Sequence, residues 1–173
     1  MKKDIPDFSL EVAVNSDFVA GVDEAGRGPL CGPVVAAAVI FKNHNVDIPV
    51  IIRDSKQMTK RQRAVAYDWI INNTIWAVAE CSPSEIDELN IYRATQKAME
   101  DLSLKFKHVD GILTDAMPLP NVEKDVILIP KGERVHVSIA AASILARAAF
   151  LKEMHELSKE VKVELLKGAG GAV

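Results

Sequence analysis

Short apolar runs separated by polar residues recur along the chain, and their length is typical of strands. The runs at residues 18–22 and 34–41 are rich in β-branched side chains and are bounded by glycine and proline, as buried strands usually are. Three further segments are candidate strands: 74–81, 111–115 and 126–129. None of these runs is long enough to cross a bilayer.

Apolar residues at helical spacing predict three helices. Thr59 is a suitable N-cap for a helix that continues to residue 73. Ser82 is followed by Pro83 at the first helical position and by Glu85 three residues past the cap, which predicts a helix reaching about residue 104. Residues 138–157 are alanine-rich and strongly helical. Early strands followed by alternating helix and strand predict an α/β fold, in which helices cover a mixed sheet.

The length of 173 residues fits one domain, and the sequence has no repeat, low-complexity segment or internal linker. We therefore expect a single catalytic domain over residues 1–173, with a C-terminal segment that is short or truncated. No apolar run follows the N-terminal lysines, so we expect no secretory signal. Cys31 and Cys81 have no metal-binding spacing, which favours a reduced, cytoplasmic protein.

The net charge of −3 argues mildly against a nucleic-acid partner, but the placement of charge matters more than its sum. Many acids lie elsewhere, within residues 84–101 and 153–164. A local basic track on an acidic protein is compatible with this pattern. The basic residues beside the motif-like segments are Arg27, Lys56, Lys60, Arg61, Arg63, Lys131, Arg134, Arg147 and Lys167.

Acidic residues recur at the ends of the predicted strands. Asp23 and Glu24 end the first strand and lead directly into a loop with three glycines, two prolines and an arginine, and Asp54, Asp115 and Glu133 lie in comparable places. A single acid at a strand end is usually a solvated turn or cap. Carboxylates gathered at one sheet edge repel each other, however, and persist mainly where cations bind.

Oxygen ligands favour Mg²⁺ or Mn²⁺ over zinc, and the four histidines are scattered without ligand spacing. Two such ions bridged by a carboxylate would suit phosphodiester hydrolysis. Successive strand side chains point to opposite faces. Asp23 and Glu24 therefore share one site only if the strand ends between them, or if Glu24 contributes its backbone carbonyl.

The loops beside these acids contain candidate phosphate-binding groups. Gly26 and Gly28 would let backbone N–H groups approach a phosphate or a ribose closely. Arg27 is a candidate phosphate clamp, with a surface ion pair as the alternative. Ser55 and Lys56 could hold a phosphate, with an ordinary helix-entry loop as the alternative.

These segments together resemble the ribonuclease HII family, the type II ribonucleases H. Residues 21–30 read Gly-Val-Asp-Glu-Ala-Gly-Arg-Gly-Pro-Leu and are similar to the family's first motif almost letter for letter. The similarity runs from about residue 17 to residue 150 in the family's order. The other matching segments are 54–56, 90–95, 112–117, 131–133 and 138–147.

The resemblance implies a ribonuclease H-like fold and an endonuclease that cleaves the RNA strand of RNA–DNA hybrids. It also implies incision of DNA at embedded ribonucleotides, which leaves 3′-hydroxyl and 5′-phosphate ends. The family's metal-binding and catalytic set falls on Asp23, Glu24, Asp115 and Glu133, with Mn²⁺ or Mg²⁺ as the cofactor and two ions in the catalytic complex.

Substrate contacts also follow from the resemblance. The segment Gly26-Arg27-Gly28 would read the ribose 2′-hydroxyl, the group that distinguishes RNA from DNA. The other implied contacts are Asp54, Ser55, Lys56, Lys131, Ser138 and Lys167. The expected partners are the RNA–DNA hybrid and ribonucleotide-containing duplex DNA, with no membrane, and the family's members are generally monomers.

The chain departs from the family's pattern in three places. Glu133 stands where the family usually has aspartate, and the segment Ala148-Ala149-Phe150-Leu151 occupies the place where the family commonly has an arginine–aspartate pair. Residues 167–170 read Lys-Gly-Ala-Gly, without the tyrosine that stacks at the ribose–DNA junction. The sister family, ribonuclease HIII, also lacks that tyrosine but usually has an extra N-terminal substrate-binding domain.

Two other functions remain open from the sequence. The first is a family member that binds hybrids with impaired catalysis, because Glu133 adds a methylene to a metal ligand and the tail is short. The second is another enzyme of the ribonuclease H fold, such as a recombination nuclease or a transposase. A substrate without any need for a 2′-hydroxyl would support the second.

Overall fold

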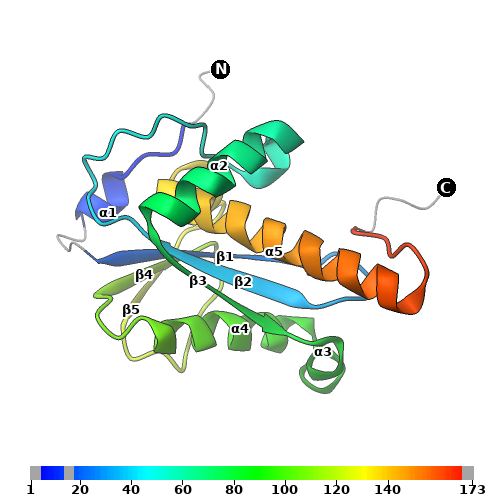
Figure 1. Ribbon diagram of the computed structural model, residues 1–173. Helices are drawn as coiled ribbons and strands as arrows, with labels where there is room; N and C mark the ends of the chain where they lie inside the picture. Colours follow the sequence, from blue (N-terminus) through cyan, green and yellow to red (C-terminus); the bar gives the residue numbers. More distant parts are fainter. Residues whose placement is uncertain (1–4, 14–17, 169–173) are drawn as a thin grey trace.

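A mixed five-stranded sheet lies between helices in the computed structural model, which describes residues 5–13 and 18–168 (Figure 1). The strands lie in the order β3-β2-β1-β4-β5. Helices α1, α2 and α5 cover one face of the sheet, and α3 and α4 cover the other (Figure 1). The strands are β1 (Val19–Ala25), β2 (Val34–Ile40), β3 (Ile75–Cys81), β4 (Gly111–Thr114) and β5 (Asp125–Leu128). The helices are α1 (Ser9–Ala13), α2 (Lys60–Asn73), α3 (Pro83–Leu89), α4 (Ile91–Lys105) and α5 (Val137–Val161), with 3₁₀ turns η1 (Ser55–Gln57) and η2 (Gly132–Arg134).

The pairing of β1 opens one edge of the sheet. Strands β1, β2 and β3 are antiparallel neighbours, whereas β4 runs parallel to β1 and to β5. The pairing of β1 with β4 ends where Val22 lies opposite Thr114, while β1 continues to Ala25 with only β2 beside it. The edge of β1 beyond Val22 is therefore left open, and a functional site can form there.

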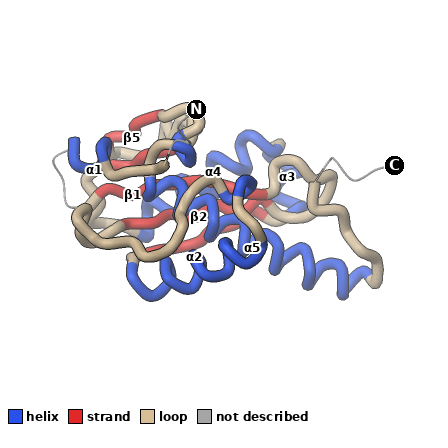
Figure 2. The backbone as a smooth tube through the Cα atoms, turned by 90° about the horizontal axis from the view of Figure 1, so that it is seen from above, coloured by secondary structure: helices blue, strands red, loops and turns tan. Residues whose placement is uncertain are grey.

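Two apolar cores hold the helices onto the sheet. Strand β2 is completely buried, and its alternate side chains enter the two cores on opposite faces, one with α4 and one with α2 and α5. Figure 2 shows the strands between the helices and the last turns of α5 extending past the ends of the strands. None of the helices in the described ranges is both long and apolar enough to span a membrane.

Helix α5 lies unusually close to β1 at Gly21. A Cβ atom on this glycine would lie 2.2 Å from the carbonyl carbon of Ser138 and 2.4 Å from the backbone nitrogen of Ile139. Because only glycine leaves room for this contact, the first turn of α5 lies directly against the strand. The residues just before α5 are thereby brought to the end of β1.

Most predicted elements are present, and their caps explain their limits. Thr59 and Ser82 each form a capping box, with Gln62 and Glu85 respectively. The predicted helix over 83–104 is wrong, because the chain forms two helices separated at Asn90. Asn90 has a φ of 70°, ends α3, and starts α4 by accepting a hydrogen bond from the Arg93 backbone N–H at 3.0 Å. A side-chain cap at this point favours a new helix over continuation of the old one.

Candidate active site

One cavity of about 300 Å³ lies at the open edge of β1 and gathers residues from distant parts of the chain. It brings together all of the predicted site residues except Lys131 and Ser138. Its lining consists of Asp23, Glu24, Ala25, Gly26, Arg27, Gly28, Pro29, Asp54, Ser55, Lys56, Asp115, Glu133, Ser143, Arg147, Phe150, Leu151, Lys167 and Gly168.

Two neighbouring parallel strands, β1 and β4, place Asp23 and Asp115 side by side. Val22 pairs with Thr114, so Asp23 and Asp115 are the next residues along β1 and along the chain after β4. Of the two predicted ways for Asp23 and Glu24 to share a site, the first is not seen, because the strand does not end between them and β1 stays paired with β2 through Ala25. The second, a contribution from the Glu24 backbone carbonyl, stays a prediction. Both residues nevertheless line the cavity, which lies at the edge that β4 leaves open.

The turn after β5 completes the acidic set. Lys131 has a left-handed backbone with a φ of 60°, and its N–H donates to Asp115 Oδ1 at 2.6 Å. The Gly132 N–H donates to the same oxygen at 3.3 Å, and Glu133 follows immediately in η2. Lys131 therefore contributes its backbone to the site, while its side chain is exposed and lies outside the cavity lining.

Burial and mutual repulsion govern the protonation of these acids. Burial raises the pKa of Asp23 well above its usual range, and the neighbouring carboxylate of Glu24 raises it further. Burial also raises the pKa of Glu24, although Arg27, whose Nη1 lies 3.2 Å from Glu24 Oε1, works in the opposite direction. The pKa of Glu133 is raised by burial and by the adjacent Asp115. A bound cation would stabilise the charged forms of these groups.

The acids fit a divalent metal ion by their chemistry. Glu24 Oε2 and Glu133 Oε2 are buried and have no hydrogen-bond partner among the described residues. Buried carboxylate oxygens without donors are suitable ligands for hard cations such as Mg²⁺ and Mn²⁺. Within residues 5–13 and 18–168, no three acidic, histidine or cysteine side chains already converge on one metal position.

The loop at residues 54–56 contributes one free cation and two side chains with structural roles. Asp54 is buried and caps η1 by accepting from the Lys56 backbone N–H at 3.0 Å. Ser55 Oγ lies 3.0 Å from Ser143 Oγ, which ties the loop to α5. Lys56 is exposed at the rim of the cavity, so its ammonium group can approach an anionic ligand.

Ser138 does not reach the cavity, contrary to the expected substrate contact. Its side chain is completely buried, and its Oγ donates to Glu11 Oε1 at 2.5 Å. Its backbone N–H lies 3.3 Å from the same oxygen. The reason is the contact at Gly21, which covers the first turn of α5. Ser138 and Glu11 together join α1 to the start of α5. No periodic pattern in the sequence indicates this role for Glu11.

Helix α5 adds site residues that were not predicted. Ser143, Arg147, Phe150 and Leu151 all line the cavity, and their spacing places them on one face of the helix. That spacing, together with the polar residues on an alanine-rich helix, is a signal that the sequence already contained. Arg134 in η2 was also missed as a site residue; its Nε lies 3.7 Å from Glu133 Oε1 and 3.9 Å from Asp54 Oδ2.

The predicted tail segment is described only in part. Lys167 and Gly168 line the cavity on the rim provided by the end of the chain. Ala169 and Gly170 lie outside the described residues. The tail therefore supplies a lysine to the cavity rim.

Comparisons with known proteins show which family this chain is similar to. The family model for Ribonuclease HII matches residues 20–173. Ribonuclease HII of Wolbachia sp. subsp. Brugia malayi is 41% identical over 169 residues, which cover 95% of this chain and 82% of the relative. Ribonuclease HII of Rickettsia felis is 44% identical over 155 residues, which cover 87% and 77% of the two chains.

Solved structures share the fold. The PCNA:RNase HII complex from Archaeoglobus fulgidus has a TM-score of 0.78 at 23% identity, covering 88% of this chain and 82% of that chain. Bst-RNase HIII in complex with Mn²⁺ has a TM-score of 0.68 at 28% identity, covering 89% and 58%. The predicted ribonuclease H-like mixed sheet flanked by helices is confirmed.

Proposed function

Because the chain belongs to the ribonuclease HII family and is therefore a ribonuclease H enzyme, we propose that it is a metal-dependent endonuclease. It cleaves the RNA strand of RNA–DNA hybrids and incises DNA at embedded ribonucleotides, leaving 3′-hydroxyl and 5′-phosphate ends. The observation that carries this proposal is one cavity that collects the four predicted metal-binding acids, together with Asp54, and has cationic side chains on its rim.

Asp23, Glu24, Asp115 and Glu133 hold Mg²⁺ or Mn²⁺ in this proposal, with two ions in the catalytic complex. The raised pKa values and the two carboxylate oxygens without partners support it. The structure of Bst-RNase HIII with Mn²⁺ supports a divalent cofactor for this fold. Ions bound there would activate the attacking water and stabilise the leaving oxygen.

The residues around the acids orient the substrate. Arg27 is held by Glu24 through Nη1, yet its side chain stays 44% exposed, so its other donors can reach a phosphate. Gly26 has a φ of 106°, and a Cβ atom there would lie 2.3 Å from the Pro33 carbonyl oxygen. The turn is therefore built around glycine and presents its backbone to a ribose 2′-hydroxyl. Lys56 and Lys167 provide further positive charge on the rim.

The position of Glu133 favours an active enzyme over a hybrid-binding protein with impaired catalysis. Glu133 lines the same cavity as Asp115, and the N–H of the preceding residue, Gly132, donates to Asp115 Oδ1 at 3.3 Å. The extra methylene of glutamate therefore does not remove this group from the acidic set.

The test is cleavage of two labelled duplexes, an RNA–DNA hybrid and a DNA duplex with one embedded ribonucleotide, followed by analysis of the product ends. Both should be cut only with a divalent ion present, with 3′-hydroxyl ends, and Asp23→Asn should abolish cutting of both. Cutting of the hybrid alone would restrict the proposal to hybrids. Cutting of a DNA duplex that lacks any ribonucleotide would overturn it in favour of another nuclease of this fold.

A further inference from the structure

A second cavity of about 240 Å³ lies next to the catalytic cavity, in the groove between α2 and α5. Helix α2 contributes Lys60, Arg63 and Tyr67, which stand three or four residues apart and therefore share one helix face. Helix α5 contributes Arg147 and Leu151, and these two residues also line the catalytic cavity. The groove, named here the α2–α5 groove, is thus continuous with the site.

The charge in this groove is of one sign. Lys60, Arg63 and Arg147 line it, and no acidic residue of the described chain does. Arg147 Nε is buried and has no hydrogen-bond partner among the described residues. Burial lowers the pKa of Arg147, and the nearby Arg63 lowers it further, against the opposing effect of Asp54. A bound anion would relieve this repulsion, as a cation would relieve the repulsion among the acids of the adjacent catalytic cavity.

Part of this charge is already committed to the fold. Arg63 Nη1 donates to the backbone carbonyl of Ser55 at 3.2 Å and also to that of Met58, so it fixes the loop that carries Lys56. Lys60, at the start of α2, is exposed. Lys60 and Arg147 are therefore the residues best able to contact a ligand, one at the outer part of the groove and one at its junction with the catalytic cavity.

We propose that the α2–α5 groove binds the sugar–phosphate backbone of the nucleic acid where it leaves the catalytic cavity. This inference rests on the proposed function, because it extends the same substrate beyond the cleavage point. Phosphates contact Lys60 and Arg147, while Tyr67 and Leu151 offer apolar surface to the sugars. The occupant is a polyanion because the lining is cationic, although the whole chain carries a net charge of −3.

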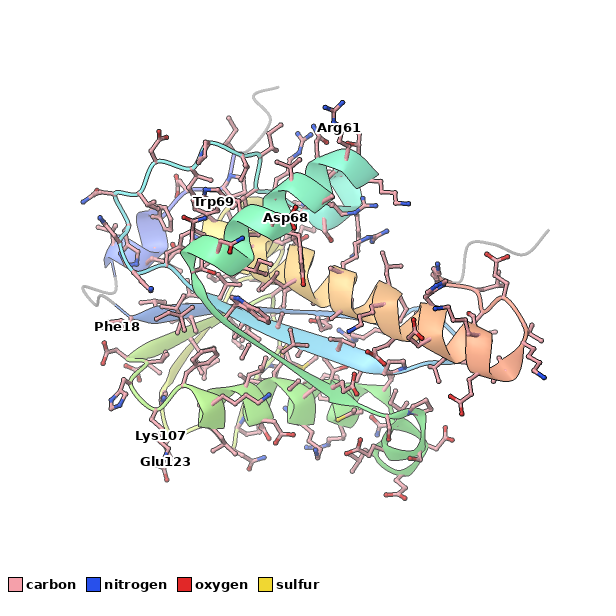
Figure 3. All side chains as sticks on the ribbon, viewed as in Figure 1. Phe18, Arg61, Asp68, Trp69, Lys107 and Glu123 are labelled. Atoms are coloured by element: carbon pink, nitrogen blue, oxygen red, sulfur yellow. The ribbon has the colours of Figure 1, made fainter. Side chains whose placement is uncertain are left out.

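The test compares Lys60→Ala with Lys107→Ala in the full chain. Both substitutions remove one exposed lysine, but Lys107 lies on the opposite side of the sheet from α2 (Figure 3). Binding of a labelled RNA–DNA hybrid is measured over a salt series in the Asp23→Asn background, and cleavage is measured in the otherwise unchanged enzyme. Thermal melts check that each variant is folded.

Lys60→Ala should weaken hybrid binding at low salt and lower the slope of log affinity against log salt by about 0.9, the value for one lost phosphate contact. It should raise KM and leave kcat unchanged, since this contact is the same in the ground state and the transition state. Lys107→Ala should match the unsubstituted protein in affinity, salt slope and KM.

If Lys60→Ala and Lys107→Ala behave alike while the unsubstituted enzyme cleaves hybrids, the groove inference is overturned and the proposed function stands. If the unsubstituted enzyme binds hybrids without cleaving them, the proposed function fails, and the salt slope of Lys60→Ala alone decides about the groove. If the protein binds no hybrid, both are overturned.

Discussion

The close contact between β1 and α5 predicts a large effect from a small substitution, Gly21→Ala. The added Cβ would lie 2.2 Å from the carbonyl carbon of Ser138, whereas ordinary van der Waals contact begins near 3.4 Å. The start of α5 must therefore move by roughly 1 Å, because the obstacle is helix backbone that cannot rotate away.

The stability loss can be estimated from that displacement. Overpacking costs about 1–3 kcal/mol, and we expect the upper part of this range because no flexible side chain can yield. For a protein of this size, each kcal/mol lowers Tm by roughly 2–4 °C, so Gly21→Ala should lower Tm by about 6–12 °C. Gly132→Ala should cost less, since its Cβ would meet the end of the flexible Ile139 side chain at 2.5 Å.

The same shift should reduce catalysis. Helix α5 carries Ser143, which lies 3.0 Å from Ser55, and it directly follows η2, which carries Glu133. A misplacement of about 1 Å in a catalytic group can cost on the order of 100-fold in rate. Below its own Tm, Gly21→Ala should therefore cleave hybrids far more slowly than the unsubstituted enzyme.

Gly28→Ala is the matched control for stability. A Cβ at Gly28 would have no atom within 4 Å, so the free energy of unfolding should change by no more than roughly 0.5 kcal/mol, as is typical of surface positions. Tm should therefore change by no more than about 1–2 °C. Thermal unfolding of the three alanine variants, measured without divalent ions, gives the comparison. Equal Tm values for Gly21→Ala and Gly28→Ala would refute the argument that the β1–α5 contact needs glycine.

Three further predictions concern the acids and the buried serine. Burial raises the pKa of Asp23, so between its unfolded and folded pKa values the folded protein holds a proton that the unfolded chain has released. The metal-free protein should therefore lose stability as the pH rises through this window. Asp23→Asn should reduce this loss of stability, measured as Tm in thermal melts across the acidic range. An identical dependence of Tm on pH in the variant would contradict this. Glu133→Asp should raise cleavage in Mg²⁺ relative to Mn²⁺, because Mg²⁺ demands a stricter octahedral geometry, and an unchanged metal ratio would count against a ligand role for Glu133. Ser138→Ala should lower the free energy of unfolding by about 1–3 kcal/mol, because it removes a hydrogen-bond donor from the buried Glu11. The expected result is a lower Tm with KM unchanged. A raised KM at unchanged Tm would instead indicate that Ser138 contacts the substrate.

The sequence could predict the acidic set because strand ends are local features. Asp23 and Asp115 each follow a short apolar run, and parallel pairing of β1 with β4 brings them to one edge. Glu133 follows β5 in the same way, through the turn whose backbone holds Asp115. The sequence could not show that Glu24 also lines the cavity, because this depends on where the pairing of β4 with β1 ends.

Other features depended on tertiary contacts that no local pattern encodes. Ser138 belongs to a family-like segment, but the approach of α5 to Gly21 decides that its side chain is buried. Glu11 lies in a short helix without apolar periodicity, and its role exists only through α5. The break at Asn90 was missed because apolar spacing continues across it, while its left-handed backbone does not show in that spacing.

Cleavage of an RNA–DNA hybrid across a series of Mn²⁺ concentrations, by the unsubstituted enzyme and by Asp23→Asn, tests the central claim most directly. The claim is that the acids at the end of β1 form a metal site that cuts the RNA strand. The account predicts no cleavage without a divalent ion, a rate that saturates with Mn²⁺, and loss of that rate in Asp23→Asn. Cleavage that persists in a chelator, or that is undiminished in Asp23→Asn, would contradict it.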